Sequence, residues 1–152
     1  MFKRILVPVD GSELAEKAID RAKKLATHFG AELHFLRVYA REQVLADPHS
    51  PFDTYHLVVT AEDAKKRALA YLATIQTKFV ESKLIVQTDT IESNEKVGKA
   101  IAEYAAANGV DLIVMTSHGY TGFRRLIMGS VTTETLHHAR CPVWVEPANE
   151  EA

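Results

Sequence analysis

Residues 110–130 read VDLIVMTSHGYTGFRRLIMGS, an apolar run followed at once by a loop with three glycines and two arginines. The apolar part, residues 110–115, is short and rich in Val and Ile, which predicts a buried β-strand. Gly119 and Gly129 lack a Cβ, so the backbone of the loop can approach a ligand closely. Ser130 then opens a helical pattern. This order of a strand, a glycine-containing loop and the start of a helix is typical of an α/β unit that binds an anion.

The rest of the chain alternates between strand and helix patterns. Apolar or alternating runs predict the strands, and apolar residues three and four positions apart predict the helices. Asn94 is the expected cap of the third helix, and Gly30 is expected to end the first. Strands are expected over residues 3–9, 32–39, 83–89, 110–115 and 142–146, helices over 12–29, 57–79, 94–108 and 130–138, and a surface loop over 41–55.

This alternation predicts an α/β fold with a parallel sheet. The apolar first and fourth strands indicate burial on both faces. Right-handed crossovers then give an open, doubly wound five-stranded parallel sheet with helices on both faces. We expect one domain over residues 1–147 and a frayed tail over 148–152. Ligands of such sheets bind beyond the carboxyl ends of the strands, so Asp10 and the glycine-containing loop mark the expected site.

Composition excludes several classes of protein. The chain has 152 residues, 47% hydrophobic and 25% charged, with a formal net charge of −2. This balance gives no basic footprint for nucleic acid or a membrane surface, and no segment approaches the ~20 apolar residues of a membrane span. We therefore expect a cytoplasmic protein. Cys141 is the only cysteine, which rules out an intrachain disulfide, and we expect it to be packed as a small hydrophobe. No His, Asp and Glu cluster has metal-ligand spacing.

The common phosphate-binding motifs are absent. A Walker A loop needs a lysine before its Ser or Thr, and Gly129 stands directly before Ser130. The dinucleotide fingerprint GxGxxG also fails, since only Gly11 follows the first strand. Residues 119–122 spell the GxxG of KH RNA-binding domains, but basic flanks and the KH element order are missing. The exposed N–H groups of residues 129–132 favour a phosphate. A plain turn followed by a helix cap explains the same residues about equally well.

At this point the chain resembles the universal stress proteins. Their pattern after the fourth strand is G-x2-G-x9-G-[ST], and Gly119, the nine residues YTGFRRLIM, and Gly129-Ser130 match its second half. The segments ILVPVDGSELAEKAI, HFLRV and HARCPVWV extend the likeness over nearly the whole chain. Thr116 stands where the pattern has its first glycine, which adds a Cβ beside the expected nucleotide. The resemblance implies a universal stress protein-like fold, related to that of adenine nucleotide alpha hydrolases.

The resemblance also implies an ATP site, with Mg²⁺ accompanying the nucleotide. Asp10 would accept a hydrogen bond from a ribose hydroxyl, Val38 would offer backbone groups to the adenine, and Met115 would pack on the base. On the residues alone, Asp10 is explained equally well as an acidic residue at the start of a helix. Val38 is explained as a core valine. The implied site residues are Pro8, Val9, Asp10, Val38, Met115, Thr116, Ser117, His118, Gly119, Gly129, Ser130, Val131 and Thr132. Arg124 and Arg125 would either pair with phosphates or stay solvated.

Three functions remain open. The favoured one is a stress-response protein that binds ATP as a regulatory ligand, with slow or no hydrolysis. The others are a nucleotide-free dimeric interaction protein and a true ATPase. Fast phosphoryl transfer needs positioned cations and a group that orients the nucleophile, and we predict no catalytic residue. The SGGxDS loop of sulfur-transferring and amidating relatives is replaced here by VDGSE. Gly129 and Ser130 favour a filled site, and Thr116 favours an empty one.

The last strand suggests how the chain associates. Val143, Trp144 and Val145 form a short strand that we expect at an edge of the sheet, where it invites pairing with another chain. Similar proteins dimerise through this strand, so the resemblance implies a homodimer with a twofold axis. The alternative is that Trp144 packs under the neighbouring helix. Protein clients leave no trace in the sequence.

Overall fold

The computed structural model describes residues 1–40, 43–46, 56–117 and 128–148. Its main sheet has five parallel strands in the order β5-β2-β1-β6-β7. This arrangement confirms the predicted doubly wound α/β fold. The strands are β1 (Arg4–Pro8), β2 (Glu32–Tyr39), β5 (Val86–Glu92), β6 (Leu112–Thr116) and β7 (Val143–Glu146), and the helices are α1 (Ala15–Phe29), α2 (Ala61–Thr77), α3 (Val97–Ala107) and α4 (Ser130–His138).

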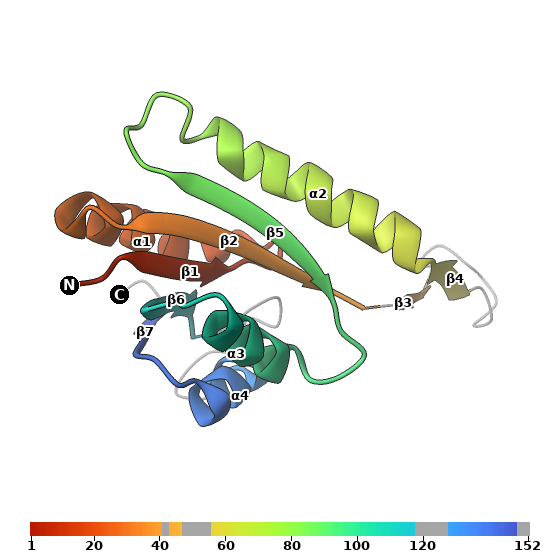
Figure 1. Cartoon of the computed structure of the whole chain (residues 1–152). Coiled ribbons are helices and arrows are strands. Elements are labelled where there is room, and N and C mark those ends of the chain that lie inside the picture. Colours follow the sequence, from red (N-terminus) through yellow and green to blue (C-terminus); the bar gives the residue numbers. More distant parts are fainter. Residues whose placement is uncertain (41–42, 47–55, 118–127, 149–152) are drawn as a thin grey trace.

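The helices cover both faces of the sheet. Figure 1 shows α1 and α2 on one face, and α3 and α4 on the other. Each face has its own apolar core. Phe35 and Leu72 belong to the cluster under α1 and α2, while Leu36 and Ile101 belong to the cluster under α3. Neighbouring residues of β2 thus point to opposite faces, as the period of a strand requires.

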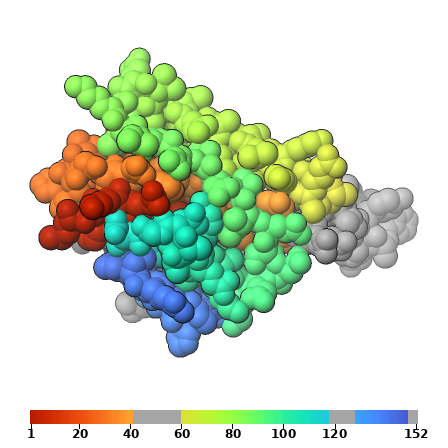
Figure 2. Space-filling view, viewed as in Figure 1, coloured from red at the N-terminus to blue at the C-terminus, as the bar shows by residue number. Residues whose placement is uncertain are grey.

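The centre of the sheet joins distant parts of the chain. β1 pairs with β2 on one side and with β6 on the other, with Ile5 opposite Leu33 and Leu112. Figure 2 shows the same closeness on the surface, where the first residues of the chain, in red, lie beside β6, in cyan. The cores of β1 and β6 are buried, which explains their continuous apolar runs.

Helix α1 follows the predicted apolar stripe. Ala18, Ile19 and Ala22 are buried against the sheet, and Gly30 ends the helix with a φ of 67°. The helix begins at Ala15, three residues later than predicted, because residues 12–14 form a turn whose carbonyls accept hydrogen bonds from residues 15–17.

The region before α2 differs from the prediction. The expected surface loop over 41–55 contains a strand, β3 (Gln43–Ala46), which pairs in antiparallel fashion with β4 (His56–Val59). The helix expected over 57–79 therefore begins at Ala61. Thr60 caps it, since its hydroxyl oxygen accepts a hydrogen bond from the Asp63 N–H. The β-branched pair before Thr60 favours a strand, and the side-chain cap fixes the helix start.

Two further boundaries were misplaced. β5 spans residues 86–92 rather than 83–89, because it pairs with β2 as far as Tyr39 opposite Glu92. Residues 82–85 instead form a turn, in which the Ser82 hydroxyl oxygen accepts from the Leu84 N–H. Asn94 does not cap α3. The helix begins after Lys96, two residues beyond the expected position, and no side chain in the described ranges caps it.

Helices α3 and α4 approach each other very closely at Gly98. This residue is buried, and a Cβ added there would lie 2.4 Å from the Glu134 Cβ, 2.5 Å from the Val131 carbonyl oxygen and 2.8 Å from the Thr135 nitrogen. Two of these neighbours are backbone atoms, which cannot move aside alone. Gly98 therefore sets the spacing of the two helices.

The edge strand β7 is tied to α1 by side chains. Arg21 in α1 donates to the Glu146 carboxylate through Nε at 2.9 Å and Nη2 at 3.0 Å. The Trp144 indole donates to the same carboxylate at 2.9 Å, and the Arg21 guanidinium lies 5.4 Å from the indole centroid. Ala148, the first residue of the predicted tail, is buried, and its N–H donates to the Ser117 hydroxyl oxygen. Residues 149–152 lie outside the described part.

Candidate functional site

The strand order reverses between β1 and β6. From β1 the chain proceeds to β2 and β5 on one side of the sheet, whereas β6 and β7 lie on the other. In open α/β sheets this switch leaves a crevice beyond the carboxyl ends of the two central strands. Here those ends are Pro8 and Thr116, and both α1 and α4 begin nearby.

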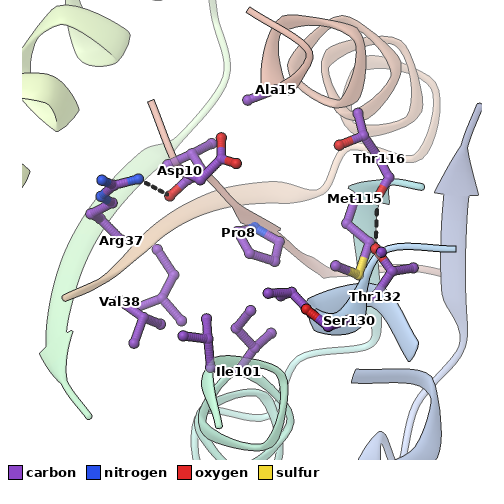
Figure 3. Close-up of a pocket in the computed structure, with 15 residues that line it drawn as sticks. Pro8, Asp10, Ala15, Arg37, Val38, Ile101, Met115, Thr116, Ser130 and Thr132 are labelled. Atoms are coloured by element: carbon purple, nitrogen blue, oxygen red, sulfur yellow. Dashed lines mark hydrogen bonds between the residues drawn. The ribbon is translucent and has the colours of Figure 1, made fainter. Parts of the chain in front are cut away.

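A cavity of about 240 Å³ lies at this crevice. It is formed by the ends of β1, β2 and β6 together with the first turns of α1, α3 and α4, as Figure 3 shows. The lining residues are Pro8, Val9, Asp10, Ala15, Leu36, Arg37, Val38, Val97, Ile101, Met115, Thr116, Gly129, Ser130, Val131 and Thr132.

One wall of the cavity is apolar. Ile101 and Met115 are buried core residues that also line it, whereas Val97 and Val131 are 38% and 37% exposed and border the solvent. Val38 also lines the cavity, and it packs against the core cluster that contains Ile101 and Met115. Such a slot suits a flat, apolar or aromatic group that leaves one edge free for polar contacts.

Asp10 is a fixed acceptor at the end of β1. Its Oδ1 accepts hydrogen bonds from the Ser12 N–H at 2.9 Å and from the Ser12 hydroxyl at 2.5 Å. Gly11 between them has a φ of 82°, which gives the chain its sharp turn. Within the described ranges, no hydrogen bond reaches Oδ2 of Asp10. That oxygen can therefore accept from a hydroxyl of a ligand.

The first turn of α4 offers donors to the same cavity. Gly129 is the N-cap, and no side chain caps the helix in the described part of the chain. The N–H groups of Ser130, Val131 and Thr132 lie in the first turn, which leaves them without partners inside the helix. Together with the helix dipole, they favour an anionic group. The Ser130 hydroxyl adds another donor at the cavity wall.

Thr132 has a structural role besides lining the cavity. Its side chain is buried, and its hydroxyl donates to the Thr116 carbonyl at 2.9 Å. The Gly129 N–H similarly donates to the Ser117 carbonyl at 2.7 Å. These bonds hold the start of α4 against the end of β6. The Thr132 hydroxyl hydrogen is thus already used within the protein, which leaves its backbone N–H as the available donor.

Ten of the predicted site residues line this cavity, and one does not. The ten are Pro8, Val9, Asp10, Val38, Met115, Thr116, Gly129, Ser130, Val131 and Thr132. Ser117 is not among the lining residues, and its N–H donates to the Glu146 carbonyl. His118, Gly119, Arg124 and Arg125 lie outside the described residues.

Sequence reasoning missed Arg37, Ala15, Leu36, Val97 and Ile101 as lining residues. Arg37 had a recognisable signal, since it is the one arginine in the otherwise apolar end of the strand ELHFLRVY. Its Nη1 donates to the Val9 carbonyl at 3.4 Å, and its guanidinium lies 5.9 Å from the Tyr71 ring centroid. The aliphatic residues had no such signal, because the tertiary fold brings their elements together.

Other expectations concern metals, thiols and membranes. Among the described residues, no group of three or more His, Cys, Asp or Glu side chains is placed to hold a metal ion. Cys141 is half-buried against the core under α3, as predicted, and burial raises the pKa of its thiol. None of the helices in the described ranges is both long and apolar enough to cross a membrane.

Comparison with known proteins decides the family. The model of the universal stress protein family matches residues 1–147. The chain belongs to the universal stress protein family. The universal stress protein YxiE of Bacillus subtilis is 34% identical over 149 residues, which are 95% of this chain and 99% of that protein.

Solved structures of universal stress proteins have the same fold. UspA from Lactobacillus plantarum is 28% identical, with a TM-score of 0.73 over 95% of this chain and 97% of its own. A family member from Arabidopsis thaliana with AMP bound is 17% identical, with a TM-score of 0.62 over 97% of this chain and 92% of that chain. At this identity the likeness to the Arabidopsis protein concerns the fold alone.

Proposed function

We propose that this universal stress protein binds an adenine nucleotide, ATP in the first instance, as a regulatory ligand in a cytoplasmic stress response. One observation carries the proposal: the first turn of α4, which no described side chain caps, and the fixed carboxylate of Asp10 face one cavity with an apolar wall. A nucleotide has the matching three parts, namely phosphates, ribose hydroxyls and a flat base. The AMP bound by the Arabidopsis relative adds support at the level of the fold.

Each part of the nucleotide has a proposed partner. The base packs between Val38 and the side chains of Ile101 and Met115. A ribose hydroxyl donates to Asp10, and the N–H groups of residues 130–132 face the phosphates. Bound ATP would supply a charged triphosphate and carry its own Mg²⁺, because no described acidic cluster provides a ready metal site.

Slow or absent hydrolysis is part of the proposal. Rapid phosphoryl transfer depends on cations at the phosphates and on a group that orients the attacking water. No lysine is among the described lining residues, and Arg37, their one cation, lies across the cavity from Ser130. The alternative of a true ATPase predicts steady turnover of roughly one per second or faster. A turnover assay with purified protein distinguishes the two.

A titration of the protein with ATP, ADP, AMP and cAMP tests the proposal, with Gly129→Val as the diagnostic variant. Gly129 has a φ of −58°, which valine adopts without strain, so the substitution adds bulk at the phosphate position. We expect ATP affinity to fall by about tenfold or more, equivalent to ~1.4 kcal/mol. Ala73→Val on the exposed side of α2 is the matched control. Wild-type protein that binds none of these nucleotides at millimolar concentration contradicts the proposal.

A nucleotide-free interaction protein is the second candidate. The edge strand β7 favours it, because the edge of a sheet invites pairing with another chain. We also propose that β7 pairs with its twofold mate to form a homodimer, which is compatible with either function. Mass spectrometry of nucleotide released from freshly purified protein separates the candidates, since the second requires an empty site.

A further inference from the structure

Arg37 is a cation with few partners inside the cavity. Its one hydrogen bond in the described part of the chain is the 3.4 Å contact from Nη1 to the Val9 carbonyl. Within those same ranges it forms no ion pair, and no other lining residue carries a positive charge. A guanidinium has five N–H donors, so most of its donors remain open to solvent or a ligand.

The contact with Tyr71 orients this guanidinium. The charged group lies 5.9 Å from the ring centroid of Tyr71 in α2. A guanidinium held over an aromatic ring keeps its N–H edge free for an anion, and its planar fork matches the oxygens of a phosphate. Arg37 thus contacts Tyr71 and lines the cavity at the same time.

Arg37 lies next to the proposed position of the ribose. It contacts Val9, the residue directly before Asp10, which is the proposed acceptor for a ribose hydroxyl. Figure 3 shows Arg37 and Ser130 on opposite sides of the cavity, with Pro8 between them. The cavity thus has two places that favour negative charge. One is the start of α4, for the 5′-phosphate, and the other lies beside the ribose end.

We propose that the cavity accepts adenine nucleotides that carry a second phosphate on the ribose, at the 2′ or 3′ oxygen, with Arg37 as the partner of that phosphate. The inference rests on the proposed nucleotide site. Asp10 accepts from the remaining ribose hydroxyl. The negative charge of Asp10 repels the added phosphate. The two hydrogen bonds that Asp10 Oδ1 accepts from Ser12 partly offset this charge. In dinucleotide-binding folds an arginine near the ribose accommodates a ribose phosphate in the same way.

Calorimetric titration with AMP, ADP, adenosine 2′,5′-bisphosphate and adenosine 3′,5′-bisphosphate tests the inference. We expect one of the bisphosphates to bind about tenfold or more tightly than AMP, the range for hydrogen bonds between charged groups. Arg37→Gln should bring the ratio of the dissociation constants of AMP and of that bisphosphate close to one. The ratio of ADP to AMP, in which the extra phosphate lies at the 5′ end, should stay the same. Arg67→Gln on the exposed face of α2 should change neither ratio.

The outcomes separate this inference from the nucleotide site itself. If AMP or ATP binds and neither bisphosphate binds more tightly than AMP, the inference is wrong and the nucleotide site stands. If a bisphosphate binds more tightly and Arg37→Gln leaves its advantage intact, Arg37 is not its partner. If no adenine nucleotide binds, both proposals fail. Arg37→Lys keeps the charge without the fork and should retain only part of the advantage.

Discussion

At the scale of single residues, Thr116 is the departure from the family pattern that bears most on ligand binding. Val114 belongs to the core under α1 and α2, and Met115 to the core under α3. By strand alternation the Thr116 side chain points to the α1 side of β6, and Figure 3 shows it near Ala15. Its Cβ therefore borders the rim of the cavity rather than the apolar slot.

Removing the Thr116 side chain should therefore have little effect on nucleotide affinity. We expect Thr116→Gly to change the ATP dissociation constant by less than about threefold, or ~0.7 kcal/mol. The same change should lower the stability by roughly 1 kcal/mol, because glycine is poor in a strand. Titration and urea unfolding measure the two effects. A gain in affinity of tenfold would show instead that the threonine crowds the ligand.

Gly98 offers a second test at this scale. A glycine-to-alanine change inside a helix normally stabilises by roughly 0.5–1 kcal/mol. At Gly98 the new Cβ would lie 2.4–2.8 Å from atoms of α4, two of them in the backbone. We expect Gly98→Ala to destabilise by about 1–3 kcal/mol, the usual range for overpacking. Denaturant unfolding measures whether the variant is more or less stable than the wild type. A variant as stable as the wild type would contradict close packing of α3 on α4.

At the scale of elements, the ion pair between α1 and β7 predicts a pH dependence. The hydrogen bonds from Arg21, and then from Trp144, hold the pKa of Glu146 below its ordinary value despite partial burial. A lowered pKa in the folded state means that the charged carboxylate stabilises the fold above the unfolded pKa, about 4.3 for Glu. That contribution is lost as the pH falls through the lower folded value.

The variant Glu146→Gln tests this linkage. At pH 7 we expect its urea midpoint to lie below that of the wild type, because the neutral amide loses the charged partner of Arg21. The difference should narrow as the pH falls below about 4.3 and vanish below the folded pKa. Glu81→Gln, at an exposed site after α2, is the control for the removal of a surface carboxylate. A difference between Glu146→Gln and wild type that is constant with pH would exclude the ion pair as its cause.

The sequence predicted the type and order of the nine elements around the main sheet, because their apolar periods are strong. It missed β3 and β4, since prolines and polar residues dominate 41–55 and the short strand before Thr60 resembles a helix start. The signal T-x-x-D at residues 60–63 marks the true start of α2. The glycine and hydroxyl residues at the strand ends predicted the polar parts of the site. Arg37 and Ile101 required the tertiary fold.

At the scale of the whole molecule, the free edge of β7 leads to a test of assembly. Among the described strands, β7 pairs with β6 alone, as expected for an edge strand. Sedimentation should show a dimer for the wild type. Val145→Lys should shift the protein to monomers, because the new charge would be buried in the pairing. Val80→Lys, at a valine that is 77% exposed, is the control. A monomeric wild type, or an unchanged Val145→Lys variant, would contradict the proposed dimer.

The link between Arg21, Glu146 and Trp144 has a practical consequence. Trp144 is the only tryptophan of the chain, and its indole is 41% exposed at the strand proposed to pair. Its tryptophan fluorescence therefore reports on that single place. Burial by a second chain would shift the emission to shorter wavelength. Since α1 also begins at the cavity, the same indole would register a movement of that helix when a ligand binds.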